Sequence, residues 1–126
     1  MLPLRGRSSG TRGASHLVAA RAAERRARLY YRVRGYRILG TNVRVGRSEI
    51  DLIVRRGSRL VFCEVKMRSR LDYGHPFEMV GVEQEERLRH AASLWQAARP
   101  ELAGLQSSFD IIGIHGRQIE RLEHAF

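Results

Sequence analysis

The chain has 126 residues, the size of one ordinary domain, and 43% of them are hydrophobic, which suffices for a modest core. Its single cysteine excludes an internal disulfide and any zinc site made of cysteines, and it fits a reducing compartment. No apolar stretch is long enough to span a membrane, and the start of the chain lacks the apolar centre of a secretory signal.

Positive charge is concentrated in the first part of the chain. The formal net charge is +10, and residues 1–70 carry 18 basic and four acidic side chains, whereas residues 71–126 carry five and nine. Genomic base composition would explain the preference for arginine over lysine, but not this uneven distribution. Because the arginine fork binds two phosphate oxygens at once, we expect a polyanion as partner, and nucleic acid is the obvious one.

The first predicted element is a helix that begins near Ala14 and Ser15 and stops at Gly35. Serine favours the start of a helix and glycine its end. The residues before this helix are rich in arginine and contain no acid. We therefore expect residues 1–13 to form a disordered basic arm and residues 14–126 to form a single domain.

Glu24 lies on the inner stripe of this helix. It shares helical spacing with Ala20, Ala27 and Tyr31, which are small or aromatic. Two interpretations stay open. Glu24 reaches acids of the sheet and completes a metal site, or it pairs on the helix surface with Arg28, four residues later.

Three strands are predicted after the helix. The first comprises residues 36–39 and 43–45, with an interruption at residues 40–42. The second and third, 49–54 and 60–66, are rich in β-branched and other apolar residues. Gly57 and Ser58 between them favour a tight hairpin turn, because glycine supplies the positive φ of the first central position.

The hairpin turn sets the expected register. A turn centred between Gly57 and Ser58 places Asp51 opposite Glu64, and Glu49 opposite Lys66. Side chains alternate between the two faces of a strand, so all four should project from one face. Three acids and one amine would then share a small patch.

This patch predicts a metal site. Two carboxylates that converge from neighbouring strands suit a hard cation such as Mg²⁺. Lys66 is the only lysine beside 22 arginines, which indicates a role that a guanidinium does not fill. A plain ion network is the alternative, but Glu64 and Lys66 lie within an apolar strand, where an unpaired acid is unfavourable.

The remaining elements are a loop, a helix and two strands. We predict a loop between Met67 and Gly81, a helix over residues 82–98, a buried strand over 108–114 and a short edge strand over 118–122. The order α-β-β-β-α-β-β predicts an α/β fold with a mixed central sheet flanked by helices. Trp95 is expected in the core, and Asp110 is expected to hold a structural hydrogen bond rather than a metal.

Five ordered motifs resemble one known family. Asp51 is followed, after a dozen residues, by Glu64-Val65-Lys66. This pattern resembles the active-site signature of the PD-(D/E)XK nuclease superfamily, which includes restriction endonucleases and Holliday-junction resolvases. The closer match is to the YraN family and extends from about Ala22 to Phe126. The motifs that carry it are Ser48-Glu49-Ile50-Asp51-Leu52-Ile53, Val61-Phe62-Cys63-Glu64-Val65-Lys66, Gly35-Tyr36-Arg37-Ile38-Leu39, Phe109-Asp110-Ile111-Ile112 and His124-Ala125-Phe126.

The chain departs from the family pattern at three places. The family usually has Gly-Glu where this chain has Ala23-Glu24, glycine where Ser48 stands, and lysine where Gln84 stands. None of these changes removes an expected metal ligand. The change at Gln84 weakens any expectation of phosphate contacts from the second helix.

The resemblance implies a restriction-endonuclease-like core and a metal-dependent endonuclease that hydrolyses phosphodiester bonds. It implies that Asp51 and Glu64 hold Mg²⁺ or Mn²⁺, with Glu24 and the Val65 carbonyl as further ligands. Lys66 would position or activate the attacking water.

The resemblance also implies supporting residues and partners. Glu49 and Gln84 would support the site, and the candidate nucleic-acid contacts are Arg44, Arg47, Arg68 and Arg70. DNA is the favoured nucleic acid, no membrane partner is expected, and a homodimer is left open. We expect the bacterial cytoplasm as the location, with association with the nucleoid left open.

Two other functions are weighed beside the nuclease. One is a non-catalytic nucleic-acid-binding protein that retains the nuclease fold, and it predicts salt-sensitive binding without turnover. The other is an adaptor in which the hairpin charges form salt bridges with a protein partner.

Overall fold

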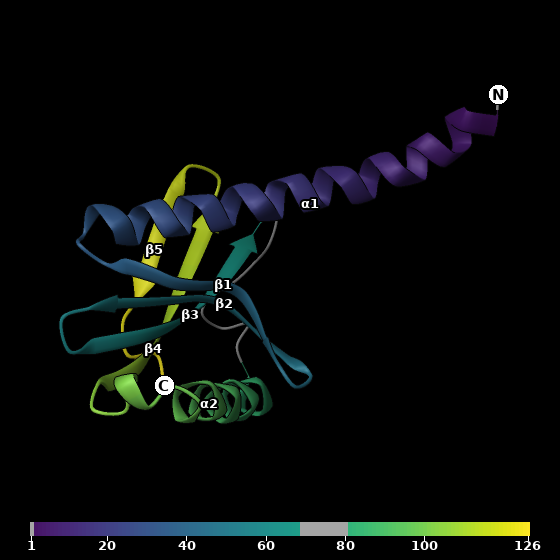
Figure 1. Ribbon diagram of the computed structural model, residues 1–126. Coiled ribbons are helices and arrows are strands. Elements are labelled where there is room, and N and C mark those ends of the chain that lie inside the picture. Colours follow the sequence, from purple (N-terminus) through teal and green to yellow (C-terminus); the bar gives the residue numbers. More distant parts are fainter. Residues whose placement is uncertain (1, 69–80) are drawn as a thin grey trace.

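In this computed structural model, a five-stranded sheet lies between two helices (Figure 1). The structure describes the backbone of residues 2–68 and 81–126, and the side chains of residues 16–67 and 81–126. The elements are α1 (Leu2–Val33), β1 (Arg37–Val45), β2 (Ser48–Arg56), β3 (Arg59–Arg68), α2 (Val82–Ala97), the 3-10 turn η2 (Pro100–Leu102), β4 (Gln106–His115) and β5 (Gln118–Leu122). The predicted order and the α/β class are confirmed.

The sheet is mixed, as predicted. Its strands follow the spatial order β1-β2-β3-β4-β5. Only the central pair, β3 and β4, is parallel, and the chain between them contains α2. The other three pairs are antiparallel. A parallel pair needs such a crossover, and this one places α2 on one face of the sheet.

Each face of the sheet packs against one helix (Figure 1). The alternation of side chains along β2 and β3 explains this division. Apolar residues that face α1 include Leu52, Val54, Val61 and Cys63. Those that face α2 include Ile53, Leu60 and Phe62, and Phe62 meets Trp95 edge to face, so Trp95 is a core residue as predicted.

The β2–β3 hairpin has the predicted register. Its pairs run from Arg56 and Arg59 to Leu52 and Cys63. Gly57 has φ +60°, the left-handed conformation that the predicted turn needs at this position. The turn chemistry therefore positions the acids of β2 near those of β3.

Helix α1 starts earlier than predicted and ends as predicted. It begins at Leu2 rather than near Ala14, and its first half projects beyond the sheet (Figure 1). Helix propensity does not explain this extension, because residues 2–13 contain three glycines, one proline and no alanine. The division into a basic arm and one domain stays a prediction. Gly35, with φ +87°, lets Tyr36 N–H donate to the Tyr31 carbonyl at 3.0 Å, which closes the helix.

Strand β1 is continuous where an interruption was predicted. The pairing with β2 shifts register between Ile38 and Gly40, and the strand then continues to Val45. Gly40 therefore marks a β-bulge and not a strand end, because a bulge absorbs one extra residue without ending the ladder. Among the described residues, no helix has the length and apolar character needed to cross a membrane.

Candidate active site

Asp51 lies where β2 and β3 separate. The ladder between them stops at Leu52 and Cys63, one pair before the predicted pairing of Asp51 with Glu64. Instead, the backbone N–H of Val65 donates to Asp51 Oδ2 at 2.9 Å. The Asp51 carboxylate thus takes the place of a backbone acceptor and lies against β3, close to Glu64.

Glu64 and Lys66 form the second part of the site. Their side chains are 12% and 18% exposed, and Lys66 Nζ lies 3.4 Å from Glu64 Oε1. The side-chain amide of Gln84, in the first turn of α2, donates to the same oxygen at 3.3 Å. The crossover helix therefore contributes a contact to the site, and the supporting role of Gln84 stays a prediction.

Burial and like charge perturb both carboxyl groups. Burial, and then the charge of Glu64, raises the pKa of Asp51 from 3.8 to about 7, although the Val65 N–H acts in the opposite direction. Burial also raises the pKa of Glu64, and Lys66 counteracts this effect. The site holds more negative charge than its own cation neutralises, which is the electrostatic condition that favours a bound metal ion.

Glu24 reaches this site from α1. Its charge contributes to the raised pKa of Asp51, and Asn42 Nδ2 donates to Glu24 Oε1 at 3.2 Å. Among the described ion pairs, none joins Glu24 to Arg28, so the helix-surface alternative finds no support. Asn42 was not predicted as a site residue. Asn42 has a φ of +49°, which asparagine tolerates better than most residues. This conformation is visible in the structure but not in the sequence.

Glu49 pairs with β1 across the sheet. It is the cross-strand partner of Arg44 on β1, and Arg44 Nη2 lies 3.7 Å from Glu49 Oε2. The Glu49 side chain is 44% exposed and the Arg44 side chain 69%. Within the described residues no ion pair joins Glu49 to Lys66. The β2–β3 ladder ends before the predicted pair of Glu49 and Lys66, but the charge of Glu49 contributes to the raised pKa values of Asp51 and Glu64.

A pocket of about 430 Å³ lies beside the site. Its lining residues are Arg47, Ser48, Glu49, Gln84, Arg87 and Leu88. Arg47, a predicted nucleic-acid contact, faces α2 across this pocket. Arg87 was not predicted, because only the packing of α2 on the sheet brings residues this far apart in the sequence together.

Two predicted nucleic-acid contacts remain to be placed. The backbone of Arg68 ends β3 and pairs with His115, whereas its side chain is outside the described part of the structure. Arg70 lies outside the described residues. Both therefore stay predictions.

The donor set fits Mg²⁺ or Mn²⁺ better than zinc. In the described part of the chain, no three histidine, cysteine or acidic side chains gather tightly enough to hold a metal by themselves. Mg²⁺ needs only one or two carboxylates when water and substrate phosphate complete its shell. The Val65 carbonyl adds a further oxygen on the same side, because in a strand a residue's N–H and C=O face the same neighbour.

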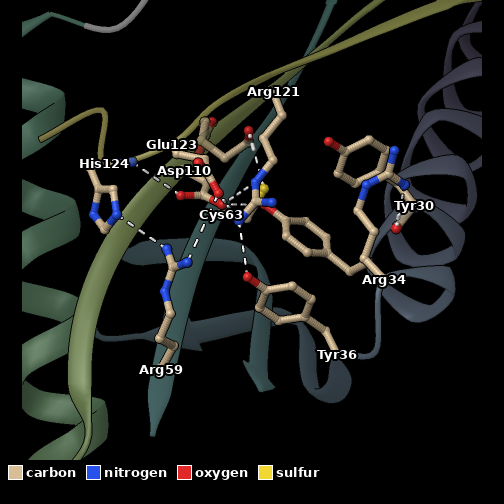
Figure 2. A network of polar contacts seen from close by, with 11 residues as sticks. Tyr30, Arg34, Tyr36, Arg59, Cys63, Asp110, Arg121, Glu123 and His124 are labelled. Carbon is tan, nitrogen blue, oxygen red and sulfur yellow. Dashed lines mark hydrogen bonds and ion pairs between the residues drawn. The ribbon is translucent and has the colours of Figure 1, made fainter. Parts of the chain in front are cut away.

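A second polar cluster, around Asp110, is structural (Figure 2). The Asp110 carboxylate is fully buried and accepts hydrogen bonds from Tyr31 Oη at 2.8 Å, Arg121 Nε at 2.8 Å and His124 N at 3.3 Å. Burial raises the pKa of the neighbouring Cys63 thiol, which keeps it protonated and a poor nucleophile. The structural role predicted for Asp110 is confirmed.

Comparisons with known proteins agree on one family. The family model described as "Uncharacterised protein family UPF0102" matches residues 23–114. A UPF0102 protein of Dinoroseobacter shibae is 38% identical over 110 residues, which cover 87% of this chain and 81% of that protein. A UPF0102 protein of Azorhizobium caulinodans is 42% identical over 107 residues, 83% of this chain and 79% of that protein.

Proposed function

Since the chain belongs to the uncharacterised protein family UPF0102, the YraN family, we propose a function from the site itself, namely metal-dependent hydrolysis of nucleic-acid phosphodiester bonds. The observation that carries the proposal is the geometry of Asp51, Glu64 and Lys66. Two desolvated carboxyl groups adjoin one half-buried ammonium group at the opening of a hairpin. A structural ion network would pair each acid, whereas Asp51 has only a backbone N–H as its described hydrogen-bond partner.

In this proposal Asp51, Glu64 and the Val65 carbonyl would hold Mg²⁺ or Mn²⁺, with Glu24 as a further ligand. When bound, the metal supplies a Lewis acid for the phosphoryl oxygen and lowers the pKa of coordinated water. Lys66 orients the attacking water and neutralises charge on the phosphate through its ammonium group. Gln84 holds Glu64 in place through its amide hydrogen bond.

The first prediction concerns cleavage and metal binding together. Wild-type protein should cut at least one member of a panel of duplex, branched, flapped and single-stranded DNA and RNA in Mg²⁺ or Mn²⁺, and EDTA should abolish cleavage. Asp51→Asn and Lys66→Met should each reduce the cleavage rate by about a hundredfold or more while retaining the folded state. Gel assays of end-labelled substrates and circular dichroism measure the two properties.

A matched control is Glu101→Gln, which removes the charge of an exposed acid in η2, remote from the site. It should cleave like the wild type. Mn²⁺ at a hundredfold excess over its Kd should stabilise the wild type by about 2.7 kcal/mol, but not Asp51→Asn. If Asp51→Asn or Lys66→Met cleaves as fast as the wild type, the assignment of these residues to the active site is wrong.

The uneven charge distribution favours a second candidate function, a nucleic-acid-binding protein without catalytic activity. Residues 1–70 carry most of the positive charge irrespective of any metal. This candidate predicts salt-sensitive binding, no cleavage of any substrate in the panel and no shift of the melting temperature in millimolar Mn²⁺.

A further inference from the structure

A second pocket, of about 420 Å³, lies at the end of the sheet where α1 ends and β2 turns into β3. Figure 1 shows this end of the sheet at the left. Its lining residues are Gly35, Arg37, Leu39, Arg55, Arg56 and Gly57. None of them belongs to the candidate active site or to the pocket beside α2. Three of the six are arginines, which indicates an anionic ligand.

Arg37 and Arg55 are direct cross-strand partners on β1 and β2. Like charges placed directly opposite each other destabilise an antiparallel ladder. Among the described ion pairs, none provides a carboxylate for Arg37, Arg55 or Arg56. An anion between the guanidinium groups would offset this repulsion.

Two of the three arginines are held in position before any ligand arrives. Arg55 Nε donates to the Gly57 carbonyl at 2.9 Å, and Arg56 Nη1 donates to the Arg34 carbonyl at 2.9 Å. The Arg56 guanidinium also lies over the Tyr36 ring, 4.6 Å from its centroid. Each guanidinium has five N–H donors, so donors remain for a ligand, and a fixed side chain loses less entropy on binding.

Other arginines of the protein are used differently. Arg121, which is 10% exposed, donates to Asp110 and Tyr36, and Arg26 donates to the carbonyls of Gly116 and Arg117. These arginines connect elements of the fold. Among the pocket arginines, Arg56 also connects elements, whereas Arg55 bonds only within its own hairpin and none of the described side-chain hydrogen bonds or ion pairs involves Arg37.

We propose that this pocket binds a backbone phosphate of the nucleic-acid ligand, at a distance from the bond that is cleaved. The proposal rests on the proposed function, since it takes nucleic acid as the ligand. Arg55 lies four residues from Asp51 on β2, which corresponds to about 13 Å along a strand, or about four base pairs of duplex. The pocket would thus extend the footprint beyond the active site.

The test measures binding of a fluorescent duplex and a single-stranded oligonucleotide by anisotropy over a range of salt concentrations without divalent metal. Arg37→Gln and Arg55→Gln should each weaken binding roughly tenfold at low salt and reduce the slope of log K against log salt by about 1. Their melting temperatures should equal or exceed that of the wild type, because the cross-strand repulsion is removed. The charge-matched control is Arg117→Gln, which replaces an exposed arginine in the β4–β5 turn. It should lose less affinity than the pocket variants and show a smaller change in the salt slope.

Each other outcome overturns the proposal. If the wild type binds nucleic acid and the pocket variants match Arg117→Gln, the pocket inference fails while the proposed function stands. If weaker binding is accompanied by a fall in melting temperature, both arginines are structural. If the wild type binds neither oligonucleotide, the inference and the proposed function fail together.

Discussion

At the scale of single residues, Asp51 is the most perturbed acid with a proposed chemical role. It lies outside the β2–β3 ladder, and its carboxylate accepts a hydrogen bond from Val65 N–H. Burial raises its pKa to about 7. The same burial that destabilises the ionised carboxylate prepares the site for a cation. Stability without metal and affinity for metal should therefore depend on pH in opposite ways.

The second prediction follows from this pKa. Because the folded pKa of Asp51, about 7, exceeds its ordinary value of 3.8, the folded state binds more protons than the unfolded state between these values. The stability of the metal-free protein should thus fall as pH rises through this window. Asp51→Asn, which retains an acceptor for Val65 N–H, should melt about 5 °C above the wild type at about pH 8 and show a smaller difference at about pH 5.

Thermal melts in EDTA at several pH values measure this effect, and Glu101→Gln should follow the wild type throughout. Binding of Mn²⁺ should strengthen over the same range, since the metal displaces a proton. A difference between Asp51→Asn and wild type that is constant with pH would contradict the titration of Asp51.

At the scale of elements, Asp110 connects four parts of the chain. It stands on β4 and accepts hydrogen bonds from Tyr31 on α1, Arg121 on β5 and the backbone of His124 near the C-terminus (Figure 2). The last residues are held further by Ala125 N–H, which donates to the Phe109 carbonyl, and by the Phe126 ring, which stacks on Phe109 at 4.7 Å. This network positions α1, and hence Glu24, over the sheet.

The third prediction is that Asp110→Ala is strongly destabilising. It leaves the guanidinium of Arg121 and the hydroxyl of Tyr31 without their buried acceptor, which costs about 3–5 kcal/mol. Denaturant unfolding measures the loss. Ser107→Ala, an exposed position on the same strand, should change the free energy of unfolding by less than about 0.5 kcal/mol. A loss below about 1 kcal/mol for Asp110→Ala would show that the network is not needed.

At the scale of the whole molecule, the N-terminal part of the chain is rich in positive charge and also extends beyond the sheet. The first half of α1 projects beyond the sheet (Figure 1). The described core residues begin at Ala23. Three arginines, Arg5, Arg7 and Arg12, precede residue 14. This segment is therefore suited to long-range attraction of a polyanion rather than to stabilising the fold.

The fourth prediction is that these three arginines contribute to nucleic-acid binding and not to stability. Replacing all three by glutamine should reduce the salt slope of binding by up to about 3 and leave the melting temperature unchanged. The matched variant with three lysines keeps the charge and should keep the slope. A melting temperature lowered by several degrees in the glutamine variant would place this segment within the folded domain.

Several features of the fold follow from local sequence. The order of elements, the hairpin register and the placement of Trp95 in the core were predicted because alternation, turn residues and helical spacing are visible within short windows. The same windows missed the start of α1 and the bulge at Gly40. The glycines and the proline of residues 2–13 disfavour a helix, so propensity gives no signal for the earlier start, and a bulge leaves no sharp boundary in composition.

By itself, the sequence determined which strands carry the acids of the candidate site, since turn geometry and period-two alternation are local properties. Only the tertiary structure decided that Asp51 turns to the backbone of β3, that Gln84 meets Glu64 and that Arg37 faces Arg55. These outcomes depend on where β2 diverges from β3 and on how the crossover helix packs, and such long-range packing has no periodic trace in the sequence.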